Sequence, residues 1–146
     1  MPTAVSNQIS ARNQIRGTVG ELKAGQAMTV VHIDASGQRL LSAITNEGVQ
    51  DLGLKRGDAV IALVKSTDAM LIKGDAVQIQ LSARNCLAGQ VSSVQKGNAM
   101  AYVSVNVGES KIGASITREA LDELQINEGG RVTVVIKATQ VLLQKA

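Results

Sequence analysis

Aromatic residues are almost missing from this chain of 146 residues, which has no Phe, no Trp and a single Tyr, Tyr102. Hydrophobic residues still make up 45% of the sequence, so the core has to be built from Val, Ile, Leu and Ala. Such aliphatic and often β-branched side chains fit the pleated, half-buried surface of a β-sheet. The lack of aromatics also argues against binding of single-stranded nucleic acid, because such proteins stack bases on aromatic rings.

Cysteine and histidine are equally scarce, with Cys86 and His32 as the only examples. A single cysteine cannot form an intrachain disulfide, and a zinc site needs several Cys or His ligands. We therefore expect no metal bound directly by side chains. We also expect Cys86 to be a small buried hydrophobic residue and His32 to be an ordinary strand residue. Recurring carboxylate pairs, a nucleophile elbow and a phosphate-binding glycine loop are missing too, so the sequence does not predict an enzyme.

The sequence has no apolar run that approaches the length needed to span a membrane. Residues 1–8 are polar and lack the basic and apolar regions of a signal peptide. We therefore expect a cytoplasmic protein without membrane attachment. The formal net charge of +3 is compatible with an anionic ligand, but such a charge is also common in proteins that bind nothing charged.

An internal repeat determines the organisation of the chain. Ser10-Ala11-Arg12-Asn13 recurs as Ser82-Ala83-Arg84-Asn85, and extending this register without a gap gives about 20 identical pairs among roughly 65. The repeat predicts two tandem domains, at residues 10–73 and 82–146. A tail of residues 1–9 precedes them, and a linker of residues 74–81 with an extended segment at 77–81 joins them.

Each copy has the pattern of three strands, one short helix and two further strands. In the first copy we expect strands at residues 14–22, 28–34, 39–45, 59–64 and 69–72, and a helix at residues 46–52. The run at 59–64 is apolar enough to be buried on both faces, and the strand at 69–72 should close its own domain. This order is that of the oligonucleotide- and oligosaccharide-binding (OB) barrel. The prediction is an all-β chain with one short helix per domain, folded as two tandem five-stranded OB-fold-like barrels.

Thr45 and Thr117 are placed to cap the two helices. Each has a glutamate two residues later, Glu47 and Glu119, in the first turn, where a negative charge favours the helix dipole. A capping hydroxyl that accepts a helix N–H can still donate its own hydrogen elsewhere. Both threonines therefore remain candidates for a ligand contact.

Several hydrogen-bond donors recur in both copies: a Ser with an Arg two residues later, a Thr at the helix start and a Lys after the buried strand. A doubly charged tetrahedral anion needs donors that converge on its oxygens. Arginines at the surface and lysines at strand ends are often merely solvated. Recurrence of the whole set in both copies favours an oxyanion-binding site.

These residues resemble the signature of the molybdenum-pterin-binding-like (Mop) domains. That signature is a Ser-Ala-Arg-Asn opening, a following Gly-x-Val, a central Ile-Thr-x-Glu and a closing Lys-Ala/Ser after two aliphatic residues. The first copy matches it with residues 10–13, 17–19, 44–47 and 63–66, and the second with 82–85, 89–91, 116–119 and 135–138. The resemblance spans nearly the whole chain.

The resemblance implies a molybdate- or tungstate-binding protein for storage and homeostasis, with the oxyanion as its ligand and no covalent cofactor. It implies that six such domains pack together, so that a two-domain chain forms a homotrimer with oxyanions held between domains. The contact residues that it implies are Ser10, Ala11, Arg12, Thr45, Lys65 and Ser66, and their counterparts Ser82, Ala83, Arg84, Thr117, Lys137 and Ala138.

Within this set Lys65 and Ser66 would face the other residues from a neighbouring domain. Ala11 and Ala83 could contribute only main-chain groups, and Ala138 lacks the hydroxyl of Ser66, so that the two kinds of site would differ. Two alternatives stay open at this point. One is an OB-fold protein for single-stranded nucleic acid, held by weak electrostatic attraction. The other is a molybdate carrier or sensor component that acts with a separate partner.

Overall fold

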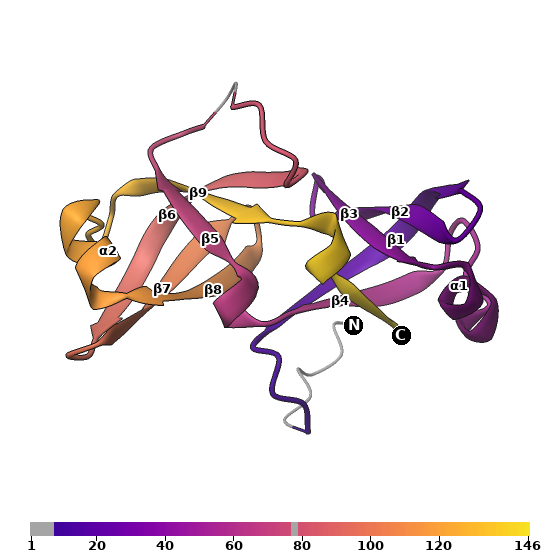
Figure 1. The fold of residues 1–146 in the computed structure, drawn as a ribbon, viewed down its shortest axis with the longest axis horizontal. Coiled ribbons are helices and arrows are strands. Elements are labelled where there is room, and N and C mark those ends of the chain that lie inside the picture. The colour runs from indigo at the N-terminus through magenta and orange to yellow at the C-terminus, as the bar shows by residue number, and fades with distance from the viewer. Residues whose placement is uncertain (1–7, 77–78) are drawn as a thin grey trace.

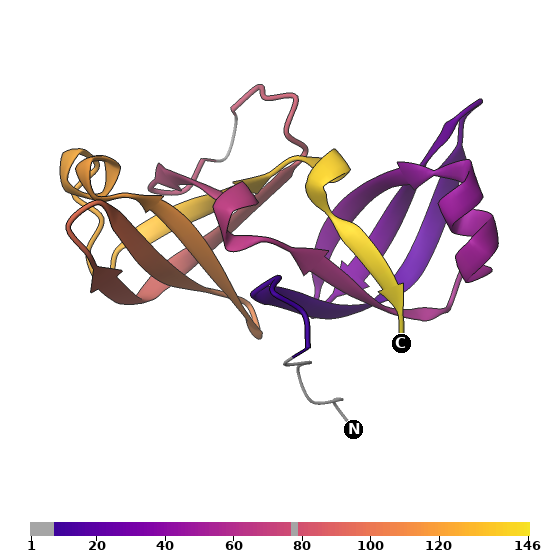
Figure 2. The same cartoon turned by 60° about the horizontal axis from the view of Figure 1, so that its bottom comes forward.

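In the computed structural model, which describes residues 8–76 and 79–146, the chain forms two curled five-stranded sheets that lie side by side (Figures 1 and 2). Each sheet carries one short helix, and the two helices lie at opposite outer ends of the molecule. Most of the expected tail and residues 77–78 of the expected linker are outside the described residues. The expected all-β class, with one short helix per half, is confirmed.

The elements of the two copies follow each other in the same order. The first copy contributes β1 (Asn13–Ala24), β2 (Met28–Ala35), β3 (Gln38–Thr45), α1 (Asn46–Leu52), β4 (Ala59–Val64), the 3-10 turn η1 (Ser66–Asp68) and β5 (Met70–Lys73). The second contributes β6 (Asn85–Lys96), β7 (Met100–Val107), β8 (Ser110–Thr117), α2 (Arg118–Glu123), β9 (Arg131–Ile136), η2 (Ala138–Gln140) and β10 (Leu142–Lys145). The strands and helix expected for the first copy are confirmed to within two residues at each end, and the two 3-10 turns were not expected.

The last strand of each copy pairs with the other copy. β5 pairs with β9 through Met70↔Val135, and β10 pairs with β4 through Leu142↔Leu63. The sheet orders are therefore β10-β4-β1-β2-β3 and β5-β9-β6-β7-β8. The prediction that residues 69–72 close their own domain is wrong. Figure 1 shows the cause: after η1 and after η2 the chain crosses to the neighbouring sheet. We call the sheet that contains β1–β4 and β10 unit 1, and the sheet that contains β6–β9 and β5 unit 2.

The core consists of aliphatic side chains that alternate along the strands. In β2 and β7 every second residue is buried, with Val31, Ile33, Val103 and Val105 fully enclosed. In β9, which pairs with β5 and β6, all residues after Arg131 are buried, so both faces of this strand are covered.

Cys86 is exposed, so the prediction of a buried thiol is wrong. It lies between buried Asn85 and Leu87 in β6, and alternation places it on the outer face of the sheet. His32 is a strand residue of β2, as predicted. Of the expected extended segment 77–81, the described residues 79–81 belong to no strand.

Both helices begin as the sequence predicts. The hydroxyl oxygens of Thr45 and Thr117 accept the N–H of Gly48 and Ala120, each over 3.0 Å. No helix among the described residues is long and apolar enough to cross a membrane.

Candidate functional site

The Ser-Ala-Arg openings lie next to the lysines that the sequence singles out. Asn13 pairs with Val64 at the start of β1, so residues 10–12 and Lys65 are at the same end of unit 1. Asn85 pairs with Ile136 in the same way, which puts residues 82–84 beside Lys137. Four of the six candidate residues of each copy are thereby grouped by one strand pair, and Ser66 and Ala138 follow directly.

The two arginines fold back on the chain that precedes them. Arg12 donates from Nη2 to the Ile9 carbonyl over 2.9 Å and from Nε to the Ser10 carbonyl over 3.3 Å. Arg84 donates from Nη1 to the Leu81 carbonyl over 3.0 Å. Each exposed guanidinium carries five N–H donors, so these bonds fix its position and leave further donors for an anion.

Lys65 and Lys137 are exposed at the end of their strands. Within the described part of the chain neither ammonium group makes a hydrogen bond or an ion pair. Both lysines are followed by a 3-10 turn that leads into the exchanged strand. Their charge is therefore available at the boundary between the two units.

The asparagines that end the Ser-Ala-Arg-Asn sequences join the units to each other. The Asn13 amide donates to the Gly113 carbonyl over 2.9 Å and accepts the Gly113 N–H over 2.7 Å. Asn85 makes the same pair of bonds with Leu41, over 2.8 and 2.7 Å. Both asparagines are 1% exposed. Sequence reasoning missed this role, although recurrence of the asparagine in both copies was a signal.

Ser66 also crosses from one unit to the other. Its hydroxyl lies 2.9 Å from that of Ser115 in β8. Thr117 is two residues further along the same face of β8, about 7 Å away along the strand. The first copy's Lys65–Ser66 turn therefore packs on the strand that ends at the second copy's Thr117. η2 lies against β3, which ends at Thr45, in the equivalent position (Figure 2).

Thr45 does not join the other first-copy residues within unit 1. It pairs with Met28, at the end of the ladder where β1 reaches Ala24, whereas Lys65 follows the opposite end at Asn13. Thr117 and Lys137 are separated in the same way in unit 2. Within one chain the candidate residues are thus divided between two places: the contact of η1 with β8 and the contact of η2 with β3.

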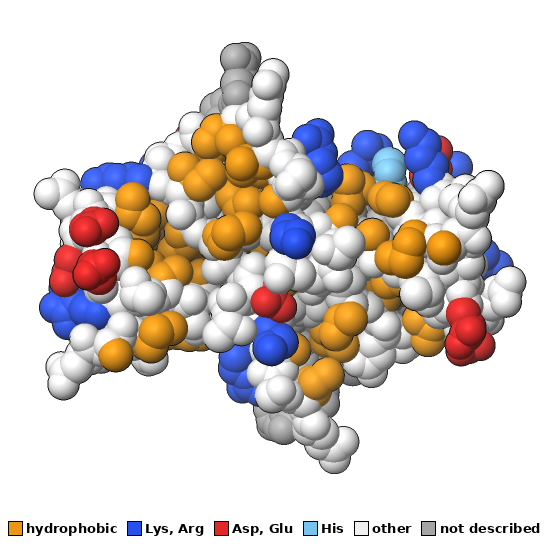
Figure 3. All heavy atoms as spheres, in the orientation of Figure 1, with side chains coloured by type: hydrophobic (Ala, Val, Ile, Leu, Met, Phe, Trp, Pro, Cys, Tyr) orange, Lys and Arg blue, Asp and Glu red, His pale blue; other side chains and the backbone are white. Residues whose placement is uncertain are grey.

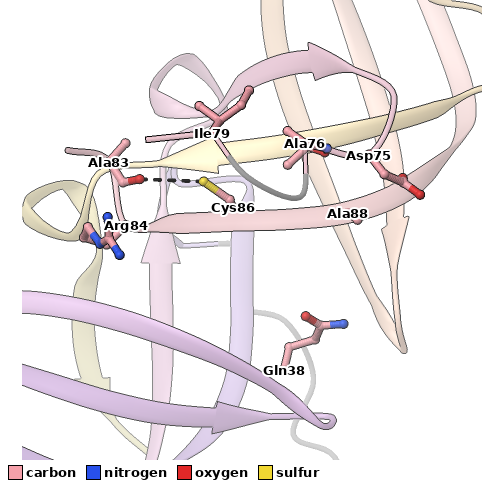
Figure 4. A pocket seen from close by; sticks show the side chains of 9 residues that line it. Gln38, Asp75, Ala76, Ile79, Ala83, Arg84, Cys86 and Ala88 are labelled. Atoms are coloured by element: carbon pink, nitrogen blue, oxygen red, sulfur yellow. Dashed lines mark hydrogen bonds between the residues drawn. The ribbon is translucent and has the colours of Figure 1, made fainter. Parts of the chain in front are cut away.

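Of the open hollows around the second-copy residues, two touch more than one of these residues. One of about 360 Å³ is lined by Ser82, Ala83 and Lys137 together with Met70–Ile72 of the exchanged β5. The other, of about 430 Å³, contains Ala83, Arg84 and Cys86 on one side and Gln38 of unit 1 on the other (Figure 4). The structure therefore places Arg84 and Lys137 on different hollows, with Ala83 between them.

Two carboxylates of the region are paired with other side chains. Asp75, which lines the larger hollow, accepts a bond from Arg131 Nε over 3.2 Å. Asp68 in η1 accepts a bond from the Gln140 amide over 3.2 Å, across the boundary between the two turns. Among the described residues, no group of three or more His, Cys, Asp or Glu side chains could hold a metal ion. The exposed Arg and Lys side chains gathered here are hydrogen-bond donors.

Comparison with protein-family models identifies the two copies. The TOBE domain matches residues 9–71 and again residues 81–143. The chain belongs to the TOBE-domain family. The resemblance to the Mop domains read from the sequence is confirmed by relatives of this TOBE-domain chain that are named as molybdenum-pterin-binding proteins.

Among these relatives, the molybdenum transport protein ModE of Herbaspirillum seropedicae is 33% identical over 141 residues, which are 95% of this chain and 52% of ModE. The molybdenum-pterin-binding protein MopB of Rhodobacter capsulatus is 32% identical over 95% of this chain and 52% of its own. The chain thus spans about half the length of these curated relatives. Molybdenum-pterin-binding protein 2 of Clostridium pasteurianum is 43% identical over 65 residues, 44% of this chain and 96% of its own.

Among solved structures, the cytoplasmic molybdate-binding protein ModG, crystallised with molybdate bound, matches with a TM-score of 0.90 and 35% identity. The match covers 95% of this chain and 99% of ModG. The two TOBE units and their arrangement are therefore those of a known binding protein.

Proposed function

We propose that this protein binds molybdate reversibly, for storage and homeostasis, and that tungstate is bound in the same sites. The likeness to molybdate-bound ModG over 99% of that chain carries the proposal. The two anions have the same charge and shape, so one set of donors serves both. The ligand is a cargo, and the proposal includes no covalent cofactor and no catalysis.

The proposed contacts are the twelve residues that the resemblance to the Mop domains implies. In each copy a Ser, a main-chain N–H and an Arg lie beside a Lys at the end of one strand pair. Charge-assisted bonds from Arg and Lys to an oxyanion are about twice as strong as neutral ones. The full list is Ser10, Ala11, Arg12, Thr45, Lys65, Ser66, Ser82, Ala83, Arg84, Thr117, Lys137 and Ala138.

A homotrimer would complete these sites. Because Thr45 and Lys65 lie at opposite ends of unit 1, a site that contains both residues needs a second chain. Large apolar side chains are exposed in two equivalent pairs, Met28 with Met100 and Met70 with Leu142, at 41–55%. Apolar side chains reach the surface on the face in Figure 3. We take these exposed apolar side chains as candidates for contacts between chains.

We place this activity in the cytoplasm. ModG is described as cytoplasmic, and the free thiol of Cys86 is compatible with a reducing compartment. Binding of single-stranded nucleic acid is not favoured, because Tyr102 is the single aromatic residue available for base stacking.

Titration calorimetry with molybdate, tungstate and sulfate, combined with native mass measurement, tests the proposal. We expect tight binding of molybdate and tungstate, weak or no binding of the smaller sulfate, and a trimer that carries the bound ions. A protein that gives no heat with molybdate, or that binds sulfate equally well, would contradict the proposal.

A further inference from the structure

The outer faces of the two equivalent strand pairs have diverged. On β7–β8 the cross-strand register places Tyr102 opposite Ser115 and Ser104 opposite Gly113. The same positions of β2–β3 hold Val30 opposite Ala43 and His32 opposite Leu41. Three hydroxyl-bearing side chains on unit 2 thus replace an imidazole and two aliphatic groups on unit 1.

The turn that packs on each face differs in the same way: the turn on unit 2 carries a hydroxyl, and the turn on unit 1 does not. η1 brings Ser66 to within 2.9 Å of the Ser115 hydroxyl. The equivalent turn, η2, brings Ala138 to β3, where the residue equivalent to Ser115 is Ala43. Two positions far apart in the sequence are therefore both Ser at one boundary and both Ala at the other. A paired difference of this kind separates the two boundaries chemically.

Tyr102 adds a third hydroxyl at the polar boundary. Its phenol oxygen lies directly over Gly113, in the space that a side chain at this position would fill. The backbone of Gly113 in turn bonds the Asn13 amide from unit 1. Tyr102 is half-buried, and its hydroxyl has no hydrogen-bond partner in the described part of the chain. The ring thus presents an unused donor beside the junction of the units.

We propose that η1 and the outer face of β7–β8 form the stronger of two unequal classes of oxyanion site, with Tyr102 and Ser115 as donors in addition to Lys65 and Ser66. This inference rests on the proposed function. In the Ser66–Ser115 pair one hydroxyl donates to the other, so one hydrogen remains for the anion. The Tyr102 hydroxyl supplies another, and the Lys65 ammonium supplies charge.

The equivalent boundary lacks these donors. There Lys137 is followed by Ala138, and Val30 and Ala43 present only carbon atoms, so that His32 is the one polar side chain among the positions compared. A tetrahedral dianion bound beside Lys137 and Ala138 therefore exchanges water for a mainly apolar surface on that side. We expect the ions of one protein to bind in two classes, with the weaker class at Lys137.

The test is molybdate calorimetry on the full chain with two variants of the stronger class. Ser66→Ala combined with Ser115→Ala recreates the Ala pair that the chain already tolerates at residues 43 and 138. Tyr102→Phe removes one oxygen. Because a hydrogen bond to a charged group contributes about 1.5–3 kcal/mol, each variant should weaken the stronger class by roughly tenfold or more and leave the weaker class unchanged.

The reverse variant, Ala43→Ser with Ala138→Ser, should tighten the weaker class. Thr18→Val, an exposed and nearly isosteric change in β1, is the matched control. Tyr102 fluorescence gives a second readout, because no other aromatic residue emits, and its change on molybdate addition should follow the stronger class.

If the Ser66→Ala/Ser115→Ala and Tyr102→Phe variants bind molybdate as Thr18→Val does, the inference is overturned and the proposed function stays intact. A single class of identical sites in the unaltered protein would overturn it as well. No molybdate binding by the unaltered protein would refute the proposed function itself, and this inference with it.

Discussion

The side chains of Asn13 and Asn85 hydrogen-bond to backbone across the two units, as a neighbouring strand would. Each amide exchanges two hydrogen bonds with the backbone of a strand in the opposite unit, at 1% exposure. They also begin the strands whose preceding residues carry the proposed donors. One side chain thereby fixes both the contact between units and the position of the Ser-Ala-Arg segment.

Asn13→Ala should destabilise the protein strongly, because it leaves the N–H and carbonyl of Gly113 buried without these partners. A buried polar group without a partner costs about 1–3 kcal/mol, so we expect a loss of about 3 kcal/mol in the free energy of unfolding, measured with urea. Asn106→Ala, an exposed asparagine in β7, is the control. Equal stability of the two variants would contradict the bridging role.

The sequence allowed the donors to be predicted, but not this bridge. Recurrence identified Ser10, Arg12 and Lys65 because donors of that kind suit an anion whatever the tertiary structure. The bridge depends on which backbone lies opposite Asn13, and that is a contact over 100 residues. The prediction that Cys86 is buried was wrong for a related reason. The face of the sheet on which Cys86 lies follows from the register of β6, not from the hydrophobicity of the side chain.

The elements follow the sequence closely because their signals are local. Alternating apolar residues, turn residues and the capping threonines each act over a few positions. The exchange of β5 and β10 has no local signal. β4 and β9 present similar apolar strands, and the four residues of β5 fit either edge. The exchange is seen only in the pairing of β5, which follows η1, with β9 of the other copy.

Gln125, two residues after the end of α2, adopts a left-handed conformation at a position where the first copy has a glycine. Gln125 has φ 52°, whereas Gly53 at the equivalent position has φ 59°. A left-handed conformation costs a non-glycine residue about 1–2 kcal/mol, partly offset by the flexibility of glycine in the unfolded chain. We predict that Gln125→Gly stabilises the protein by about 0.5–1 kcal/mol, measured as a thermal midpoint higher by a few degrees. Gly53→Gln should lower it, and opposite signs would refute the explanation.

The exchanged strand β10 is held at its end by charge. Lys145 lies 3.5 Å from an Asp58 carboxylate oxygen and donates to the Gly53 carbonyl over 3.2 Å. The N–H of Lys55 and the Lys145 ammonium hold the pKa of Asp58 below its ordinary value. Because the folded-state pKa is the lower one, Asp58 stabilises the fold above its ordinary pKa of about 4, and this contribution is lost as the pH falls through the folded-state pKa.

Thermal unfolding of Asp58→Asn against the unaltered protein measures this contribution. At neutral pH the variant should melt at a lower temperature. The difference should shrink as the pH falls below about 4 and vanish below the folded-state pKa of Asp58. A difference that stays constant down to pH 2 would show that the carboxylate charge has no part in holding β10.

The molecule as a whole is a pseudo-symmetric pair whose exposed apolar side chains also come in pairs. Met70 and Leu142, in the two exchanged strands, are 47% and 55% exposed. If they form contacts between chains, Met70→Lys with Leu142→Lys should shift the protein to smaller species in native mass measurement. Gln95→Lys, on an exposed position of β6, should not. An unchanged mass in the double variant would place the interface elsewhere.

The central claim is that the two copies together supply the donors for the oxyanion, and the lysines test it most directly. The measurement is molybdate calorimetry of Lys65→Ala combined with Lys137→Ala, with Lys23→Ala combined with Lys96→Ala as the equally charged control. We predict that affinity falls by at least about tenfold in the first variant and is unchanged in the control. Equal affinity of both variants for molybdate would contradict the account.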